Sequence, residues 1–93
     1  ETFKRITQAY LPELLDAARR EINYQRHTGN LDEDALQPEE LVGETLIKAW
    51  QYRARRPEGM SLKGWMLGVQ RQVLHRIVAQ ESSFRQLAAI SLE

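Results

Sequence analysis

The sequence contains no cysteine among its 93 residues, so disulfide bonds and thiolate-ligated metal sites are excluded. It also lacks any apolar run approaching the roughly 20 residues that a membrane-spanning helix needs, and no signal-peptide pattern opens it. These absences favour a cytoplasmic location without membrane insertion. A chain of this length is expected to form one domain with a core of modest size.

Residues that carry catalysis or bind metals are few and scattered. The two histidines, His27 and His75, have no second ligand at metal-binding spacing, and neither a phosphate-binding loop nor a G-x-S-x-G motif is present. Glu40 and Glu44 are one helical turn apart, as in carboxylate metal sites, but no E-x-x-H motif accompanies them. We therefore expect a binding domain that is not an enzyme and holds no metal or cofactor.

The charges of the chain are separated along the sequence, although 13 basic and 13 acidic residues give a net charge of zero. The segment 32–44 contains acidic residues and no basic one: Asp32, Glu33, Asp34, Glu39, Glu40 and Glu44. The segment 48–76 contains a single acidic residue, Glu58, and these basic ones: Lys48, Arg53, Arg55, Arg56, Lys63, Arg71 and Arg76. Two interpretations stay open, either ordinary solvated helix faces or separate surfaces for a basic partner and a polyanion.

Apolar residues recur at helical spacing through most of the chain, and no segment alternates convincingly with the period of two that a strand shows. The first helix is expected to resume at Pro12, which interrupts or kinks a short helix over residues 3–10. Its apolar positions are Leu11, Leu14, Leu15, Ala18 and Ile22. Gly29 is expected to end it, because glycine is the usual residue at a left-handed C-cap.

Two further helices follow. The second is expected over about residues 38–55, since a proline suits its first position. The third is expected over about residues 62–80, with Ser61 as its N-cap. A capping-box pattern that begins at Ser83 predicts a separate short final helix. The fold class is therefore all-α, a compact bundle of three main helices with a short C-terminal helix.

The second helix has two distinct faces. One is apolar and faces the expected core: Leu41, Val42, Thr45, Leu46 and Ala49. The other mixes carboxylates with a glycine and an isoleucine: Glu40, Gly43, Glu44, Ile47 and Gln51. A helix with an acidic and partly apolar outer face is typical of a surface that receives a partner.

The third helix carries a polar strip beside its apolar stripe. The strip includes two glycines and the residues Arg71, Gln72, His75 and Arg76. Arginine and glutamine side chains can read base edges, and the basic residues near the preceding loop can hold phosphates. The alternative is an ordinary solubilising strip. Trp50 and Trp65 are expected to lie in the core rather than to stack on bases.

Three blocks of the sequence resemble region 2 of the extracytoplasmic-function (ECF) sigma factors of bacterial RNA polymerase. The run L-Q-P-E-E-L-V-G-E-T-L-I-K-A-W over 36–50 is similar to region 2.2, where the pattern is roughly D-A-E-D-L-V-Q-E-T-F-x-R-A-W. The run S-L-K-G-W-M-L-G-V-Q-R-Q-V-L over 61–74 is similar to regions 2.3 and 2.4, often S-F-x-x-W-L-x-x-I-A-R-N. The run Y-L-P-E-L-L over 10–15 suits region 2.1. The resemblance covers most of residues 6–80, with the blocks in family order.

The resemblance implies two binding surfaces. The first would dock on the coiled coil of the polymerase β′ subunit: Glu40, Gly43, Glu44, Ile47 and Lys48. The second would recognise the opened promoter −10 element, with the loop 55–61 receiving a flipped base: Arg55, Arg56, Ser61, Lys63, Arg71, Gln72, His75 and Arg76. The implied partners are therefore core RNA polymerase, −10 DNA and an anti-sigma factor, and the isolated domain is expected to be a monomer.

Several departures from the family pattern keep two other functions open. Gly43 replaces a usual glutamine, Gln72 replaces a common asparagine, and the basic tail after region 2.4 is missing. A sigma-like decoy that captures an anti-sigma protein instead of DNA is therefore an alternative, and a plain helical interaction module is another. We assign residues 1–81 to the sigma-like domain and 82–93 to a linker or short helix. The chain starts without Met and is expected to be a fragment, and its last two residues are compatible with a cloning remnant.

Overall fold

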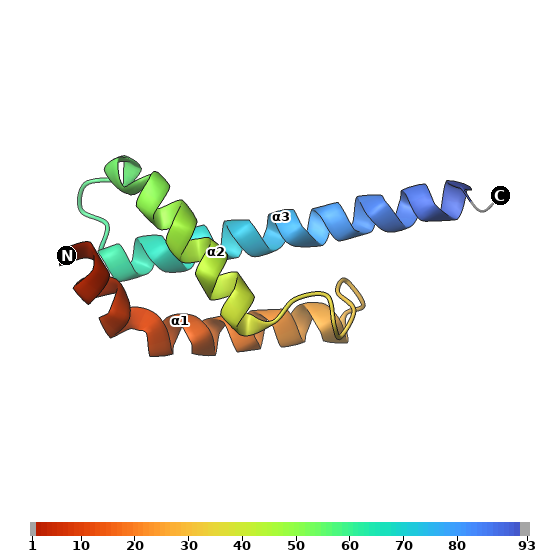
Figure 1. The fold of residues 1–93 in the computed structure, drawn as a ribbon, viewed down its shortest axis with the longest axis horizontal. Helices are drawn as coiled ribbons and strands as arrows, with labels where there is room; N and C mark the ends of the chain where they lie inside the picture. The colour runs from red at the N-terminus through yellow and green to blue at the C-terminus, as the bar shows by residue number, and fades with distance from the viewer. Residues whose placement is uncertain (1, 92–93) are drawn as a thin grey trace.

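The computed structural model describes the backbone of residues 2–91 and the side chains of residues 4, 5 and 7–89. Three α-helices contact one another pairwise: α1 (Thr2–His27), α2 (Pro38–Gln51) and α3 (Leu62–Ser91). In Figure 1, α1 and α3 run along the long axis and α2 crosses them. No strand occurs in the described residues, so the predicted all-α bundle is confirmed. None of the helices over residues 2–91 has the length and apolarity needed to cross a membrane.

Helix α1 continues through Pro12, so of the two predicted outcomes the interruption is wrong and the structure supports the kink. The first turns, red in Figure 1, run at an angle to the rest of the helix, and Pro12 removes one backbone hydrogen bond near that bend. The predicted end at Gly29 is confirmed. Gly29 has φ of +83°, and its N–H donates to Arg26 O at 3.1 Å while the Asn30 N–H donates to Gln25 O at 2.8 Å. These two bonds form a Schellman cap.

Helix α2 is shorter than predicted. It begins at Pro38, where the Gln37 N–H donates to Glu40 Oε1 at 3.0 Å. It ends at Gln51 rather than near residue 55, and a 3₁₀ turn, η1 (Arg53–Arg55), follows. The end at Gln51 is marked by Tyr52, whose φ of −109° and ψ of 22° leave helical geometry. Pro57 acts further on: a residue before proline avoids the helical region, and Arg56 is extended with ψ of 124°.

Helix α3 begins as predicted and ends much later. The Gly64 N–H donates to Ser61 Oγ at 3.0 Å, which confirms Ser61 as the N-cap. The predicted end near residue 80 and the separate helix from Ser83 are both wrong, since α3 is continuous to Ser91. No proline or glycine follows Gly68, so nothing in the sequence stops the helix. The C-terminal part of α3 extends past α2 and gives the molecule its length of 53 Å (Figure 1). Residues 92–93, set aside above, lie outside the described chain.

The core draws on all three helices and on the loop between α1 and α2. Its buried apolar residues are Leu14, Ala18, Ile22, Leu31, Leu36, Leu41, Val42, Ala49, Met66 and Leu74. The predicted inner face of α2 is confirmed, with Thr45 buried and Leu46 packed against the cluster. Two features were not predicted. Leu31 and Leu36 are buried and so hold the acidic loop against the core, and the polar residue Gln70 is among the most buried residues of α3.

Candidate groove between the second and third helices

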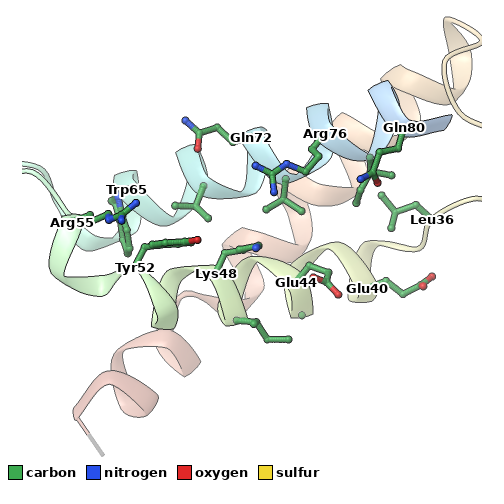
Figure 2. A pocket seen from close by; sticks show the side chains of 15 residues that line it. Leu36, Glu40, Glu44, Lys48, Tyr52, Arg55, Trp65, Gln72, Arg76 and Gln80 are labelled. Atoms are coloured by element: carbon green, nitrogen blue, oxygen red, sulfur yellow. The ribbon is translucent and has the colours of Figure 1, made fainter. Parts of the chain in front are cut away.

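An open groove of about 970 Å³ lies between the outer face of α2 and one face of α3. The α2 wall carries a row of side chains at intervals of four residues: Glu40, Glu44, Lys48 and Tyr52. The facing residues of α3 are Trp65, Val69, Gln72, Val73, Arg76, Ile77 and Gln80. Figure 2 shows the two rows on opposite walls, with Glu40 and Gln80 toward one end and Tyr52, Arg55 and Trp65 toward the other. The groove is therefore acidic at one end and basic and aromatic at the other.

The α2 wall of the groove follows from helical spacing, because residues four apart lie on one face of a helix. Leu41, Thr45 and Ala49 are buried on another face of α2, so the face with Glu40, Glu44 and Lys48 points toward the groove. All five residues expected to bind polymerase line the groove. Glu40, Glu44 and Ile47 are exposed, with 53% of Ile47 accessible, while Gly43 and Lys48 are half-buried.

The residues expected to bind DNA are divided by the structure. Arg55, Gln72 and Arg76 are exposed and line the groove. His75 is exposed on another part of α3. Arg56 Nη1 donates to Met60 O at 2.7 Å and so braces the loop. Three of the predicted side chains thus come together with the polymerase set, and five lie outside the groove.

Two of the outlying cations contact α1. Lys63 Nζ lies 2.6 Å from Glu13 Oε2, and Arg71 Nη2 lies 3.7 Å from Glu21 Oε1. The hydrogen bond to Glu13, together with the negative charge of that carboxylate, raises the pKa of Lys63 above its ordinary value. Both cations therefore have an intramolecular partner, and their assignment to DNA stays a prediction.

The positions of the two tryptophans were only partly predicted. Trp65 is half-buried and packs against the core, but Trp50, expected in the core, is 50% exposed. The guanidinium of Arg53 lies 3.7 Å from the Trp50 ring centroid, and the prediction that Trp50 is buried is wrong. The neighbouring residue Ala49 is fully buried, so the side chain of Trp50 lies on the side of this last turn of α2 that the core does not cover.

Tyr52 was missed by the sequence analysis. Its ring has Arg55 Cζ at 4.7 Å and Lys48 Nζ at 5.9 Å from the centroid, which are cation–π distances. A signal was present, because Tyr52 extends the row of Glu40, Glu44 and Lys48 by one more turn. The groove thus has an aromatic ring between two cations at its basic end.

Comparison with protein-family models, with curated proteins and with solved structures finds no match to this chain. Over the described residues, no three carboxylate or imidazole side chains gather as a metal ion would require. The groove presents carboxylates, cations, amides and an apolar floor to solvent.

Proposed function

We propose that this chain is domain 2 of a sigma factor, a cytoplasmic transcription initiation factor. It would bind the coiled coil of the polymerase β′ subunit and the opened promoter −10 element. The proposal rests on the resemblance of the three sequence blocks to ECF sigma factors. Its main structural support is that a single groove is lined by all five residues expected to bind polymerase and by three of those expected to bind DNA.

The acidic end suits a basic helical partner. Glu40 and Glu44 are exposed carboxylates one turn apart, with Ile47 exposed beside them. Charged pairs at an interface rim mainly set orientation and association rate. Burial of an isoleucine side chain contributes roughly 1.5–3 kcal/mol when it is complete. The carboxylates would therefore select the β′ coiled coil, and Ile47 would supply much of the affinity.

The cations of the groove, Lys48, Arg55 and Arg76, suit an opened DNA strand. Arg76 and Lys48 can hold phosphates, which makes affinity fall as salt rises. Gln72 has an amide that can both donate to and accept from a base edge. The loop 55–61, braced by Arg56, would receive the extruded base. Extrusion costs roughly a few kcal/mol, which contacts in the groove must offset.

The polymerase contact is tested with Glu44→Lys. We expect binding to a purified β′ coiled-coil fragment to weaken at least tenfold, on the order of 1.4 kcal/mol, in a titration by calorimetry. Glu33→Lys is the matched control, since Glu33 is an exposed carboxylate outside the groove and the charge change is identical. Equal binding by the two variants would remove the groove from the polymerase interface.

The DNA contact is tested with Arg76→Ala and a single-stranded −10 oligonucleotide at two salt concentrations. We expect weaker binding and a salt slope smaller by about one unit, because one phosphate contact is lost. Arg20→Ala, an exposed arginine on α1, is the control. A variant at position 76 that binds like the control would contradict the DNA assignment.

The end of α3 favours a second candidate, the sigma-like decoy. Beyond Gln80 the only basic residue is Arg85, and its guanidinium is paired with Asp32 at 2.8 Å and with Gly29 O at 3.1 Å. A basic tail for DNA is therefore missing from this helix. A decoy would bind an anti-sigma protein but no oligonucleotide at either salt concentration, so the same DNA titration separates the two functions.

A further inference from the structure

The part of α3 that extends past α2 exposes two large apolar side chains next to each other. Phe84 is 71% accessible and Leu87 is 64% accessible. They are three residues apart, so they lie on the same face of the helix. Beside them is a shallow open hollow of about 330 Å³, which Ala79, Gln80 and Ser83 also line. These five residues form the distal strip. Single apolar residues are common on protein surfaces, whereas adjacent ones mark a site of interaction.

The charges near the distal strip limit what can cover it. Over residues 77–91 the sequence has only two charged side chains, Glu81 and Arg85. Glu81 is half-buried, and the guanidinium of Arg85 is paired with Asp32 at 2.8 Å. A nucleic acid needs cations to hold its phosphates, and a basic protein surface needs carboxylates, so neither is attracted to this strip. The occupant that fits is a neutral surface with apolar side chains.

A second copy of the chain offers such a surface. The distal strip has both bulky side chains, Phe84 and Leu87, and a hollow beside them, so it is complementary to itself. Twofold dimers use the same patch on both copies. In an antiparallel pair of helices with the axis between positions 85 and 86, Phe84 of each copy faces Leu87 of the other. The helix continues to Ser91, and its last turns project beyond the other two helices (Figure 1), so two strips can meet away from the bundles.

We propose that two copies of this chain associate weakly through antiparallel pairing of their distal strips. The association is weak because the strip has five residues, whereas a standard interface has about 20–30 on each side. The domain would thus be the expected monomer at low concentration and a dimer at high concentration. The inference is independent of the function proposed above, since Gln80 alone of the five also lines the groove.

The test measures the average mass of the whole 93-residue chain by sedimentation equilibrium over about a hundredfold range of concentration, up to about 1 mM. The strip variant, Phe84→Gln with Leu87→Gln, removes both apolar side chains, keeps the charge, and uses a residue that favours helices nearly as well as leucine. The control variant, Tyr24→Gln with Met60→Gln, removes two apolar side chains that are exposed elsewhere. Circular dichroism checks that both variants keep their helices.

We expect the mass of the wild type and of the control variant to rise with concentration, and the dissociation constant of the strip variant to be at least about tenfold higher. A wild type that stays monomeric over the whole range would overturn the inference. Equal association of the strip variant and the wild type, or an equal loss in both variants, would also contradict it. The β′ fragment should bind the strip variant as it binds the wild type, so failure of this inference and failure of the proposed function are distinguishable.

The orientation of the pair is tested by oxidation, because the chain has no cysteine of its own. Phe84→Cys and Leu87→Cys are prepared separately, mixed and oxidised, and the crosslinked products are identified by their masses. A disulfide needs Cα atoms within about 4.4–6.8 Å, so the antiparallel pair predicts that the mixed disulfide exceeds the share expected from random pairing. A random or smaller share would overturn the antiparallel arrangement.

Discussion

Gln70 Nε2 donates a hydrogen bond to Leu14 O at 3.0 Å, and this bond joins α3 to α1 inside the core. Both residues are only 1% exposed. The other polar atom of the amide, Gln70 Oε1, is buried without a hydrogen-bond partner in the described residues. The bond fixes how the two helices align, while the unpaired oxygen carries a desolvation cost.

Substitutions at Gln70 should separate these two effects. We expect Gln70→Met to change the free energy of unfolding by less than about 1.5 kcal/mol, since it replaces the amide by an apolar chain of similar volume. Gln70→Glu should cost about 3 kcal/mol or more at neutral pH, because it buries a carboxylate facing a carbonyl oxygen. Urea unfolding measures both. A methionine variant as unstable as the glutamate variant would contradict the account.

Replacement of a glycine by alanine should change the free energy of unfolding in opposite directions on a helix surface and at the helix cap. A Cβ at Gly43 or Gly68 meets nothing within 4 Å, so alanine at either position should raise the free energy of unfolding by about 0.5–1 kcal/mol. Gly29→Ala should lower it, because its φ of +83° disfavours a side chain. Thermal unfolding of the three variants checks the signs, and a destabilised Gly43→Ala would show that α2 is packed more tightly there.

The outer part of α3 should depend on Arg85. Its contacts with Asp32 and Gly29 tie this end of the helix to the loop after α1. We expect Arg85→Ala or Asp32→Asn to speed amide exchange in residues 81–89 while the rest of α3 is unaffected, since both partners are exposed and the pair contributes only about 0–1 kcal/mol. Asp34→Asn is the matched control. Unchanged exchange in Asp32→Asn would show that the helix holds its end without the tie.

The pair of Lys63 and Glu13 should give stability a dependence on alkaline pH. The pKa of Lys63 is raised above its ordinary value of 10.5 by its hydrogen bond to Glu13. A raised pKa in the folded state means that the contribution is complete below the unfolded value and is lost as pH rises through the folded value. We expect wild type and Lys63→Gln to differ in urea midpoint at neutral pH and to converge above pH 10.5. A constant difference would contradict the pairing.

Much of the fold could be predicted from the sequence because local rules decided it. Gly29 and Ser61 mark helix ends through backbone geometry and a side-chain cap, and both predictions were confirmed. The errors concern where α2 and α3 end. Tyr52, at the C-cap of α2, leaves helical geometry with φ of −109° and ψ of 22°, and no proline or glycine over residues 44–56 marks this end in the sequence. Ser83 begins a capping-box pattern, but no proline or glycine precedes it after Gly68, and α3 continues through it to Ser91.

The candidate groove was predictable only in part. Helical spacing placed Glu40 and Glu44 on an outer face, and both are exposed. It did not predict that they share a groove with Arg76, because that depends on how α2 crosses α3, which a single sequence does not encode locally. Trp50 was misassigned because helical spacing does not show which positions the other helices cover: Trp50 is 50% exposed, whereas its neighbour Ala49 is fully buried.

The unbroken run of α3 has a mechanical consequence. Its 30 residues span about 45 Å as one rod, and its first half forms a wall of the groove. A small tilt imposed on that wall by an arriving ligand would swing the distal tip, near Leu87, through a larger arc, as a lever does. Because Arg85 contacts Asp32 and Gly29 O, such a swing would strain the link between this end of α3 and the loop after α1.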